Sequence, residues 1–335
     1  MKLKDIYIFH FSRKIQEEMY MKTRLTELLG IRYPIIQGAM AWISESDLVS
    51  AVANAGATGV IATGGQKSDY IREQIRRTKQ LTDRPFGVNL MLQTPNKDDV
   101  LEIICEEKVA FATIGAGNPV PYFEPLHAAG VKAIPVVPSV KLAKRVQEKG
   151  ADALVIEGFE AGGHDGMLTT MALMTNVIPE IDIPIVVAGS IVDGRGLAAA
   201  LIMGADGVQM GSRFLLAEEC HLHPNSKQAI MDATDTDTRV TGFTRSNNVR
   251  GLRSAFTDKY LELERQGAAD DVLSQLTRGT NRLAAVEGDT VNGLVQVGQG
   301  LNRLVRIEPA RAIVDDVVGE AVRLLTHAPQ LVAEE

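Results

Sequence analysis

Eight short apolar runs recur along this chain, and their spacing constrains the fold more than any other feature of the sequence. The runs are rich in β-branched residues, and several end in glycine or a small polar residue, as strands commonly do. Successive runs begin 21 to 30 residues apart. They cover residues 33–38, 58–65, 85–92, 110–117, 132–139, 153–158, 183–190 and 206–212.

Stretches with helical spacing lie between the runs, and several of them close with a glycine that can serve as a helix C-cap. The runs are nearly continuous rather than alternating, which is typical of parallel strands covered on both faces. Eight strand-helix units predict a (β/α)8 TIM barrel. The alternative is a doubly wound sheet, but that fold has a glycine fingerprint after its first strand, and "QGAMAW" lacks it. The expected helices are residues 21–30, 45–56, 68–81, 99–108, 122–130, 139–150 and 194–204.

Residues 213–289 break the strand-helix rhythm and are charged and mostly helical in pattern, with 258–279 the most prominent stretch. We expect a smaller capping or substrate domain there, inserted after the eighth strand of a barrel that spans residues 21–212. Residues 1–20 carry no export signal and are expected to be an extension outside the fold.

The composition excludes several classes of protein. A net charge of -7 argues against general binding to nucleic acid. No apolar run approaches the ~20 residues of a membrane span. Two cysteines predict no disulfide framework and fit a reducing cytoplasm. Cys220, His221 and His223 form a cluster, but no fourth ligand recurs at a suitable spacing, so we expect a polar loop and no metal site.

Barrels carry their chemistry at the C-terminal ends of the strands. After the seventh and eighth runs stand Gly189, Ser190, Gly211 and Ser212. Small residues in these two loops predict a phosphate site built from exposed backbone N–H groups. The alternative is a pair of ordinary tight turns.

The other strand ends supply neutral polar side chains, which suit an uncharged heterocycle with many donors and acceptors. Gln37 and Thr113 are equally well explained as partners of neighbouring backbone groups. No metal-type set of Asp, Glu and His appears. The polar residues are Gln37, Asn89, Thr113, Ser139 and Gln209.

The sixth run leads into "EGFEAGGHDG", residues 157–166, here called the glycine loop. His164 is the only one of six histidines placed at a strand end. Histidine can donate or transfer a proton near neutral pH, so we predict a catalytic role. The alternative is that His164 has a structural role, packed against the loop backbone and hydrogen-bonded to it. Glu157 and Glu160 are possible orienting partners, and Asp165 is expected to be solvated.

Six segments together resemble the flavin-dependent enoyl-acyl carrier protein reductase II (FabK) family, and the likeness extends from about residue 21 to 325. Nitronate monooxygenases share the barrel, the FMN site and the histidine. Trp42, "VVPS" and "VRGLRSAF" favour the enoyl reductases. The chain departs from the commoner pattern at Ala39 and Ser190, where glycines are usual, and at Phe159, where methionine is frequent. The segments are "YPIIQGAMAWIS", "PFGVNLML", "IPVVPS", "EGFEAGGHDG", "VVAGSIVDGRG" and "GADGVQMGSRF".

The resemblance implies a barrel that binds FMN and reduces trans-2-enoyl-acyl carrier protein with NADH, the last reductive step of bacterial type II fatty acid elongation. His164 would position the thioester carbonyl or assist proton transfer. The alternatives are a nitronate monooxygenase that uses FMN and O2, and a barrel that binds flavin without catalysis. The implied cofactor-binding residues are Ala39, Met40, Ala41, Asn89, Ser139, Glu157, Gly162, Gly163, Ala188, Gly189, Ser190, Gln209, Met210, Gly211 and Ser212.

The resemblance further implies a return to the barrel over residues 290–327 before a tail at 328–335, a homodimer, and support of activity by K+ or NH4+. The thioester would arrive on acyl carrier protein, an acidic partner that needs a local basic face, or on coenzyme A. Arg245, Arg250 and Arg253 are candidates for that face, the alternative being a solvated helix surface.

Overall fold

The computed structural model describes residues 20–245 and 247–332 of the chain. Nearly all of the expected N-terminal extension, residues 1–19, and the last three residues of the expected tail lie outside the described ranges. No helix in these ranges is both long and apolar enough to cross a membrane.

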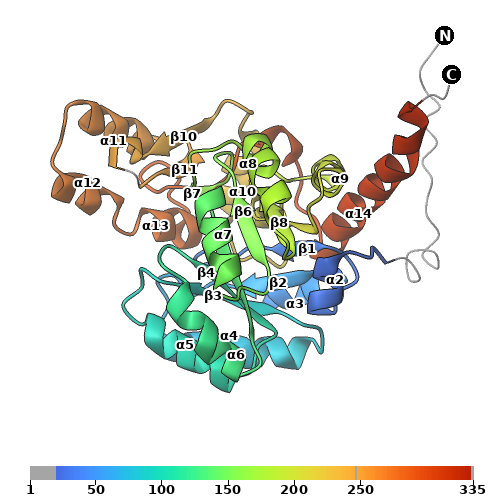
Figure 1. Cartoon of the computed structure of the whole chain (residues 1–335). Coiled ribbons are helices and arrows are strands. Elements are labelled where there is room, and N and C mark those ends of the chain that lie inside the picture. The colour runs from blue at the N-terminus through green and yellow to red at the C-terminus, as the bar shows by residue number, and fades with distance from the viewer. Residues whose placement is uncertain (1–19, 246, 333–335) are drawn as a thin grey trace, which may run out of the picture.

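Eight parallel strands form a closed barrel at the centre of the molecule (Figure 1). Each strand lies within one of the eight predicted runs, and the barrel closes where β1 pairs with β9, Ile36 opposite Gln209. The predicted TIM barrel is therefore confirmed. The strands are β1 Ile35–Gln37, β2 Thr58–Ile61, β3 Gly87–Met91, β4 Phe111–Gly115, β5 Lys132–Val137, β6 Leu154–Glu157, β8 Ile185–Ala188 and β9 Gly207–Met210.

Helices surround the barrel as the strand-helix rhythm requires. The sequence pattern predicted six helices of this ring and missed α8 and α14. The eighth helix, α14, comes after the insertion and packs against α9 and α3, which completes the ring. The helices are α3 Ser46–Asn54, α4 Ser68–Leu81, α5 Lys97–Glu106, α6 Phe123–Ala128, α7 Val140–Glu148, α8 Thr170–Val177, α9 Gly194–Ile202 and α14 Ala310–His327.

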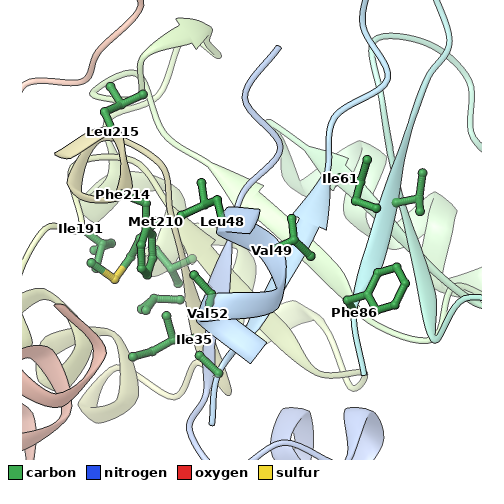
Figure 2. Packing of buried hydrophobic residues seen from close by; sticks show 14 of the residues in the cluster. Ile35, Leu48, Val49, Val52, Ile61, Phe86, Ile191, Met210, Phe214 and Leu215 are labelled. Atoms are coloured by element: carbon green, nitrogen blue, oxygen red, sulfur yellow. The ribbon is translucent and has the colours of Figure 1, made fainter. Parts of the chain in front are cut away.

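The main apolar core fills the layer between strands and helices. Figure 2 shows Leu48, Val49 and Val52 projecting from α3 in this layer, with Ile35 and Ile61 nearby. All five side chains are buried. Burying one such aliphatic side chain stabilises the fold by about 1.5–3 kcal/mol, so this layer holds the helices in register with the strands.

A second core fills the inside of the barrel, and a short helix, α2 Arg24–Leu29, closes its N-terminal end. Leu25 and Leu29 of α2 join this core, and Arg24 donates to both carboxylate oxygens of Asp206 at 2.8 and 2.6 Å. Because this end is filled with side chains, a ligand can enter the barrel only from the C-terminal ends of the strands.

The cap, residues 213–289, follows β9 and is mostly helical, as predicted. It also contains two strands that the sequence pattern did not reveal, and these form an antiparallel sheet with part of the glycine loop in the order β10-β11-β7. In Figure 1, α11 and α12 lie beside β10 and β11, to the left of the barrel. The elements of the cap and its sheet are α10 Pro224–Asp232, β10 Thr238–Thr241, β11 Val249–Leu252, α11 Ala255–Arg265, α12 Asp270–Thr277, α13 Thr280–Glu287 and β7 Gly163–His164.

Candidate active site

A cavity of about 390 Å³ opens at the C-terminal ends of the barrel strands. Its floor and sides come from the barrel loops. On the cap side, Asn281 and Ala285 of α13 and the segment Leu294 to Gln296 line it. The cavity therefore lies between barrel and cap, within the size range of small-molecule sites.

Most of the predicted site residues line this cavity. They come from loops far apart in the sequence, which the closed barrel brings to one end. The lining includes Ala39, Met40, Ala41, Asn89, Glu157, Gly162, Gly163, His164, Ala188, Gly189, Ser190, Gln209, Gly211 and Ser212.

Two predicted residues do not reach the cavity. Ser139 instead begins α7, where its hydroxyl accepts a hydrogen bond from the Leu142 N–H at 3.4 Å. Met210 is buried in the layer between strands and helices, and Figure 2 shows it beside Phe214. The reason is the alternation of a strand: Gln209 faces inward, so its neighbour Met210 faces outward.

The loop after β8 fits an anion, whereas in the loop after β9 the Ser212 hydroxyl already accepts a hydrogen bond from the Gly298 N–H at 2.9 Å. The Ser190 hydroxyl is buried and has no hydrogen-bond partner among the described residues. The N–H groups of Ser190 and Ile191 likewise donate to no protein group in the described ranges. Gly189 has a φ of +111°, and an added Cβ would lie 2.6 Å from the Thr170 hydroxyl. These unused donors form a cradle of the kind that binds phosphate.

Ser190 itself has a φ of +54°, the left-handed region that side chains disfavour. The backbone thus keeps the conformation of the glycine that is commoner at this position, while the side chain adds a hydroxyl to the cradle. Such strain of about 1–3 kcal/mol clusters at functional sites in proteins.

Two amide side chains, those of Asn89 and Gln209, also line the cavity. Asn89 donates to the Thr113 hydroxyl at 3.1 Å, and Gln209 lies across Gly38, where an added Cβ would stand 3.0 Å from the Gln209 side chain. Gln37 does not line the cavity. It is fully buried and donates to the Ser44 hydroxyl at 2.9 Å, which fits the structural alternative for this residue.

The glycine loop packs tightly against the segment that follows the cap. A Cβ on Gly162 would stand 2.5 Å from the Val297 carbonyl carbon. Glu160 accepts hydrogen bonds from the N–H and the hydroxyl of Thr170, both at 2.6 Å, at the start of α8. Glu160 therefore fixes the loop to α8 and does not orient His164.

His164 forms the two-residue strand β7 with Gly163 and pairs with Val249 of β11. The imidazole lines the cavity and is open to solvent there. Protein atoms still surround most of the ring, and this burial lowers its pKa, against a smaller opposing effect of the Asn247 side chain. Burial therefore favours the neutral imidazole, which can act as a hydrogen-bond donor.

Two carboxyl-bearing residues, Glu157 and Asp165, line the same cavity as His164. Burial, with a smaller contribution from the charge of Asp165, raises the pKa of Glu157 to about 8. Burial also raises the pKa of Asp165 to about 6, although the charge of Arg250 opposes the shift. The prediction that Asp165 is solvated is wrong, because its side chain has no exposed area. Glu157 keeps a proton at neutral pH, when most of Asp165 is ionised.

The three arginines predicted to bind a carrier differ in their surroundings. Arg250 is buried, so a surface role for it is wrong. Arg245 lies 2.8 Å from Asp270 and is largely covered. Arg253 is exposed and remains a candidate for a docking surface.

Sequence reasoning missed the contribution of the cap side. Asn281 donates to the Gln296 side chain at 3.2 Å, and this amide pair faces Gly163. Trp42, with a φ of +74°, reaches toward the same side, where the Arg282 guanidinium lies 5.8 Å from its ring centre. Of these residues, only Gln296 lies in a segment to which the resemblance had pointed, the return to the barrel over residues 290–327.

The chain is similar to known oxidoreductases over nearly its whole length. The model of the family described as nitronate monooxygenase matches residues 22–103 and 97–320. Among curated proteins, (3aS,4S,5R,7aS)-5-hydroxy-7a-methyl-1-oxo-octahydro-1H-indene-4-carboxyl-CoA dehydrogenase of Rhodococcus jostii is 33% identical, over 90% of this chain and 96% of that protein. A probable nitronate monooxygenase of Staphylococcus saprophyticus is 31% identical, over 92% and 100%.

Two solved structures extend the comparison. FabK from Thermotoga maritima is 41% identical with a TM-score of 0.90, and the match covers 93% of this chain and all of that one. A nitroalkane oxidase from Streptomyces ansochromogenes is 28% identical with a TM-score of 0.80, over 91% and 99%.

Proposed function

Because the chain belongs to the nitronate monooxygenase family of oxidoreductases, we propose that it is an FMN-dependent reductase of trans-2-enoyl thioesters that takes its electrons from NADH. Two of the similar proteins support this choice over other activities of the family. The FabK structure matches this chain at 41% identity, and the Rhodococcus jostii relative is named for a substrate bound to coenzyme A.

The observation that carries the proposal is the charge of the cavity. The described residues that line the cavity include no lysine or arginine. They do include two acidic residues, Glu157 and Asp165. A nitronate is an anion, and a thioester is neutral. Glu157 keeps a proton at neutral pH and Asp165 is covered beside Arg250, so no cation faces the cavity to compensate a bound anion for its lost hydration, whereas a neutral thioester needs none.

The donors of the cavity fit the expected FMN. The cradle at Gly189, Ser190 and Ile191 offers N–H groups and a hydroxyl for its phosphate, and Asn89 and Gln209 offer amides for its ring. When bound, FMN supplies hydride transfer between NADH and the β-carbon of the enoyl thioester.

The side chains that follow the C-terminal end of β6 would bind the thioester and assist its protonation. A neutral His164 can donate a hydrogen bond to the thioester carbonyl and so stabilise the negative charge that develops there. Glu157 retains a proton at neutral pH and is a nearby acid for the α-carbon. His164 as a proton donor needs an imidazolium, which its lowered pKa disfavours.

Anaerobic stopped-flow absorbance tests the proposal. The flavin of the purified protein should bleach on mixing with NADH and regain its colour on mixing with a crotonyl thioester. If NADH leaves the flavin oxidised while an alkyl nitronate bleaches it, the protein is a nitronate monooxygenase. A parallel series with crotonyl-coenzyme A and crotonyl-acyl carrier protein identifies the carrier. An enzyme that acts on acyl carrier protein should have a lower KM for crotonyl-acyl carrier protein than for crotonyl-coenzyme A.

Acyl carrier protein, a homodimer and dependence on K+ or NH4+ remain predictions. Arg253 is the arginine of the original three that still suits an acidic carrier, because it is exposed. Arg253→Glu should then raise KM for the carrier-protein substrate and leave KM for the coenzyme A substrate unchanged.

A further inference from the structure

A buried charge pair joins the end of the glycine loop, at Asp165, to Arg250 of β11. The side chain of Asp165 has no exposed area, and that of Arg250 is 4% exposed. Neither carboxylate oxygen of Asp165 has a hydrogen-bond partner among the described residues. Burying two charges is costly, and a buried pair often stabilises a fold no better than apolar residues of similar size. Its presence here calls for another explanation.

The hydrogen bonds of Arg250 tie the start of the glycine loop to the cap. Its Nε and Nη2 donate to the Phe159 carbonyl at 3.2 and 2.9 Å, and its guanidinium lies 4.8 Å from the centre of the Phe159 ring. Its Nη1 donates to the Thr238 hydroxyl of β10 at 2.9 Å. One rigid guanidinium therefore connects a loop residue with an outer strand of the cap sheet.

The same guanidinium also reaches the far end of the loop. The Arg250 Nε lies 3.8 Å from an Asp165 carboxylate oxygen, a distance for attraction between charges and too long for a hydrogen bond. Between these two contacts, Arg250 pairs through its backbone with Gly163, and its neighbour Val249 pairs with His164. Arg250 thus contacts the loop before and after the histidine, and its neighbour Val249 pairs with the histidine itself.

The glycines explain why the loop needs such a contact. Gly162 must lack a side chain, because a Cβ would stand 2.5 Å from the Val297 carbonyl carbon, and Gly163 has a φ of +84°. Glycine allows these conformations but also gives the backbone the greatest freedom to leave them. The residues that permit close packing therefore cannot hold the imidazole by themselves.

We propose that Arg250 is a positioning residue, which holds His164 in the cavity by fastening the glycine loop to the cap at Phe159 and Asp165. The proposal rests on the proposed function only in assuming that His164 donates a hydrogen bond to the thioester carbonyl. Glu157 and Glu160 are the other charged groups that act on the pair, and both belong to the same loop.

The test compares Arg250→Met with Arg265→Met, an exposed arginine on α11 of the same cap that contacts no part of the loop. Amide hydrogen exchange over residues 157–166 reports the rigidity of the loop, and NMR titration of the His164 imidazole reports its surroundings. In Arg250→Met, exchange of the loop should accelerate on the order of tenfold or more. The imidazole pKa should move toward its ordinary value as the ring becomes more hydrated. Arg265→Met should match the wild type in both.

Turnover should fall by about 100-fold in Arg250→Met, the effect expected when a reacting group is misplaced by about 1 Å. The loss should lie in the oxidation of the flavin by thioester, with reduction by NADH unchanged. A protein that fails to react with NADH refutes the proposed function, yet it leaves the exchange and NMR results to decide the role of Arg250.

Two further variants separate positioning from folding. Arg250→Met/Asp165→Asn removes the uncompensated charge, so its thermal midpoint should recover toward the wild type while loop exchange stays fast. Arg250→Lys keeps the positive charge but lacks the planar guanidinium, so amide exchange of the loop should be faster than in the wild type and slower than in Arg250→Met. This variant tests the proposal if Arg250→Met does not fold. The proposal is overturned if the loop is as protected as in the wild type in Arg250→Met, or in Arg250→Lys where only that variant folds.

Discussion

Glu157→Gln should change how the stability of the protein depends on pH. Glu157 has a pKa of about 8 in the folded protein, against an ordinary value of 4.5. Between these values the folded protein holds a proton that the unfolded chain has released. The free energy of unfolding therefore falls as pH rises from about 4.5 to 8, and it levels off above pH 8. Glutamine has a similar shape and cannot ionise, so the variant lacks this decline.

The size of the effect follows from the same two values. One pH unit corresponds to about 1.4 kcal/mol, which sets an upper limit of about 5 kcal/mol for the stability that Glu157 removes by pH 8. Water in the open cavity screens the carboxylate, so we expect about 2–3 kcal/mol. In a chain of this length, 1 kcal/mol shifts Tm by about 2 °C, so Glu157→Gln should melt about 4–6 °C above the wild type at pH 8.5.

Differential scanning calorimetry between pH 5 and 9 measures this difference. At pH 5 the two proteins should melt within about 2 °C, because Glu157 is then protonated in the folded state and still about a quarter protonated in the unfolded chain. Asp165 contributes in the same direction, but its pKa of about 6 confines its effect to lower pH. Glu102→Gln, an exposed carboxylate on α5, is the matched control and should follow the wild type. Parallel curves for wild type and Glu157→Gln across pH 6 to 8 would refute the argument.

Three further substitutions probe the cavity. His164→Gln should slow reoxidation of the flavin by the thioester about 100-fold in stopped flow, which is the effect of losing one hydrogen-bond donor to an oxyanion. His327→Gln is the control. Unchanged reoxidation would exclude a role of His164 in stabilising the thioester carbonyl. Gly162→Ala should weaken FMN binding in fluorescence titration, because its Cβ would stand 2.5 Å from the Val297 carbonyl carbon; wild-type affinity contradicts this. Ser190→Gly should relieve a φ of +54° and stabilise the flavin-free protein by about 1 kcal/mol, yet lower FMN affinity; tighter binding means that the hydroxyl does not contact phosphate.

The barrel could be predicted from the sequence because each of its strands is a continuous apolar run with its own local signal. Helix α8 was missed because a short stretch such as "TMALMTNV" has little amphipathic contrast. Strand β7 has two residues and no periodicity at all. It exists because β11, more than 80 residues later in the chain, lies beside the glycine loop. No local pattern contains that pairing.

The site residues divide in the same way. Gly189, Ser190 and His164 could be predicted because barrel geometry places strand ends together regardless of their distance in sequence. Met210 lies outside the cavity because a shift of one residue along a strand reverses the direction of its side chain. Asp165 looked like a solvated loop residue because its burial depends on Arg250, whose own position depends on the cap sheet.

The cap therefore does more than cover the barrel mouth. A glycine-rich loop allows close approach to a ligand, but its freedom works against holding a side chain within a fraction of an ångström, as catalysis requires. The strands of the barrel end before His164, so the barrel alone cannot supply that restraint. In this protein the restraint comes from β11, through its backbone at Gly163 and His164 and through the Arg250 side chain at both ends of the loop. Any movement of the cap sheet against the barrel must move the imidazole with it.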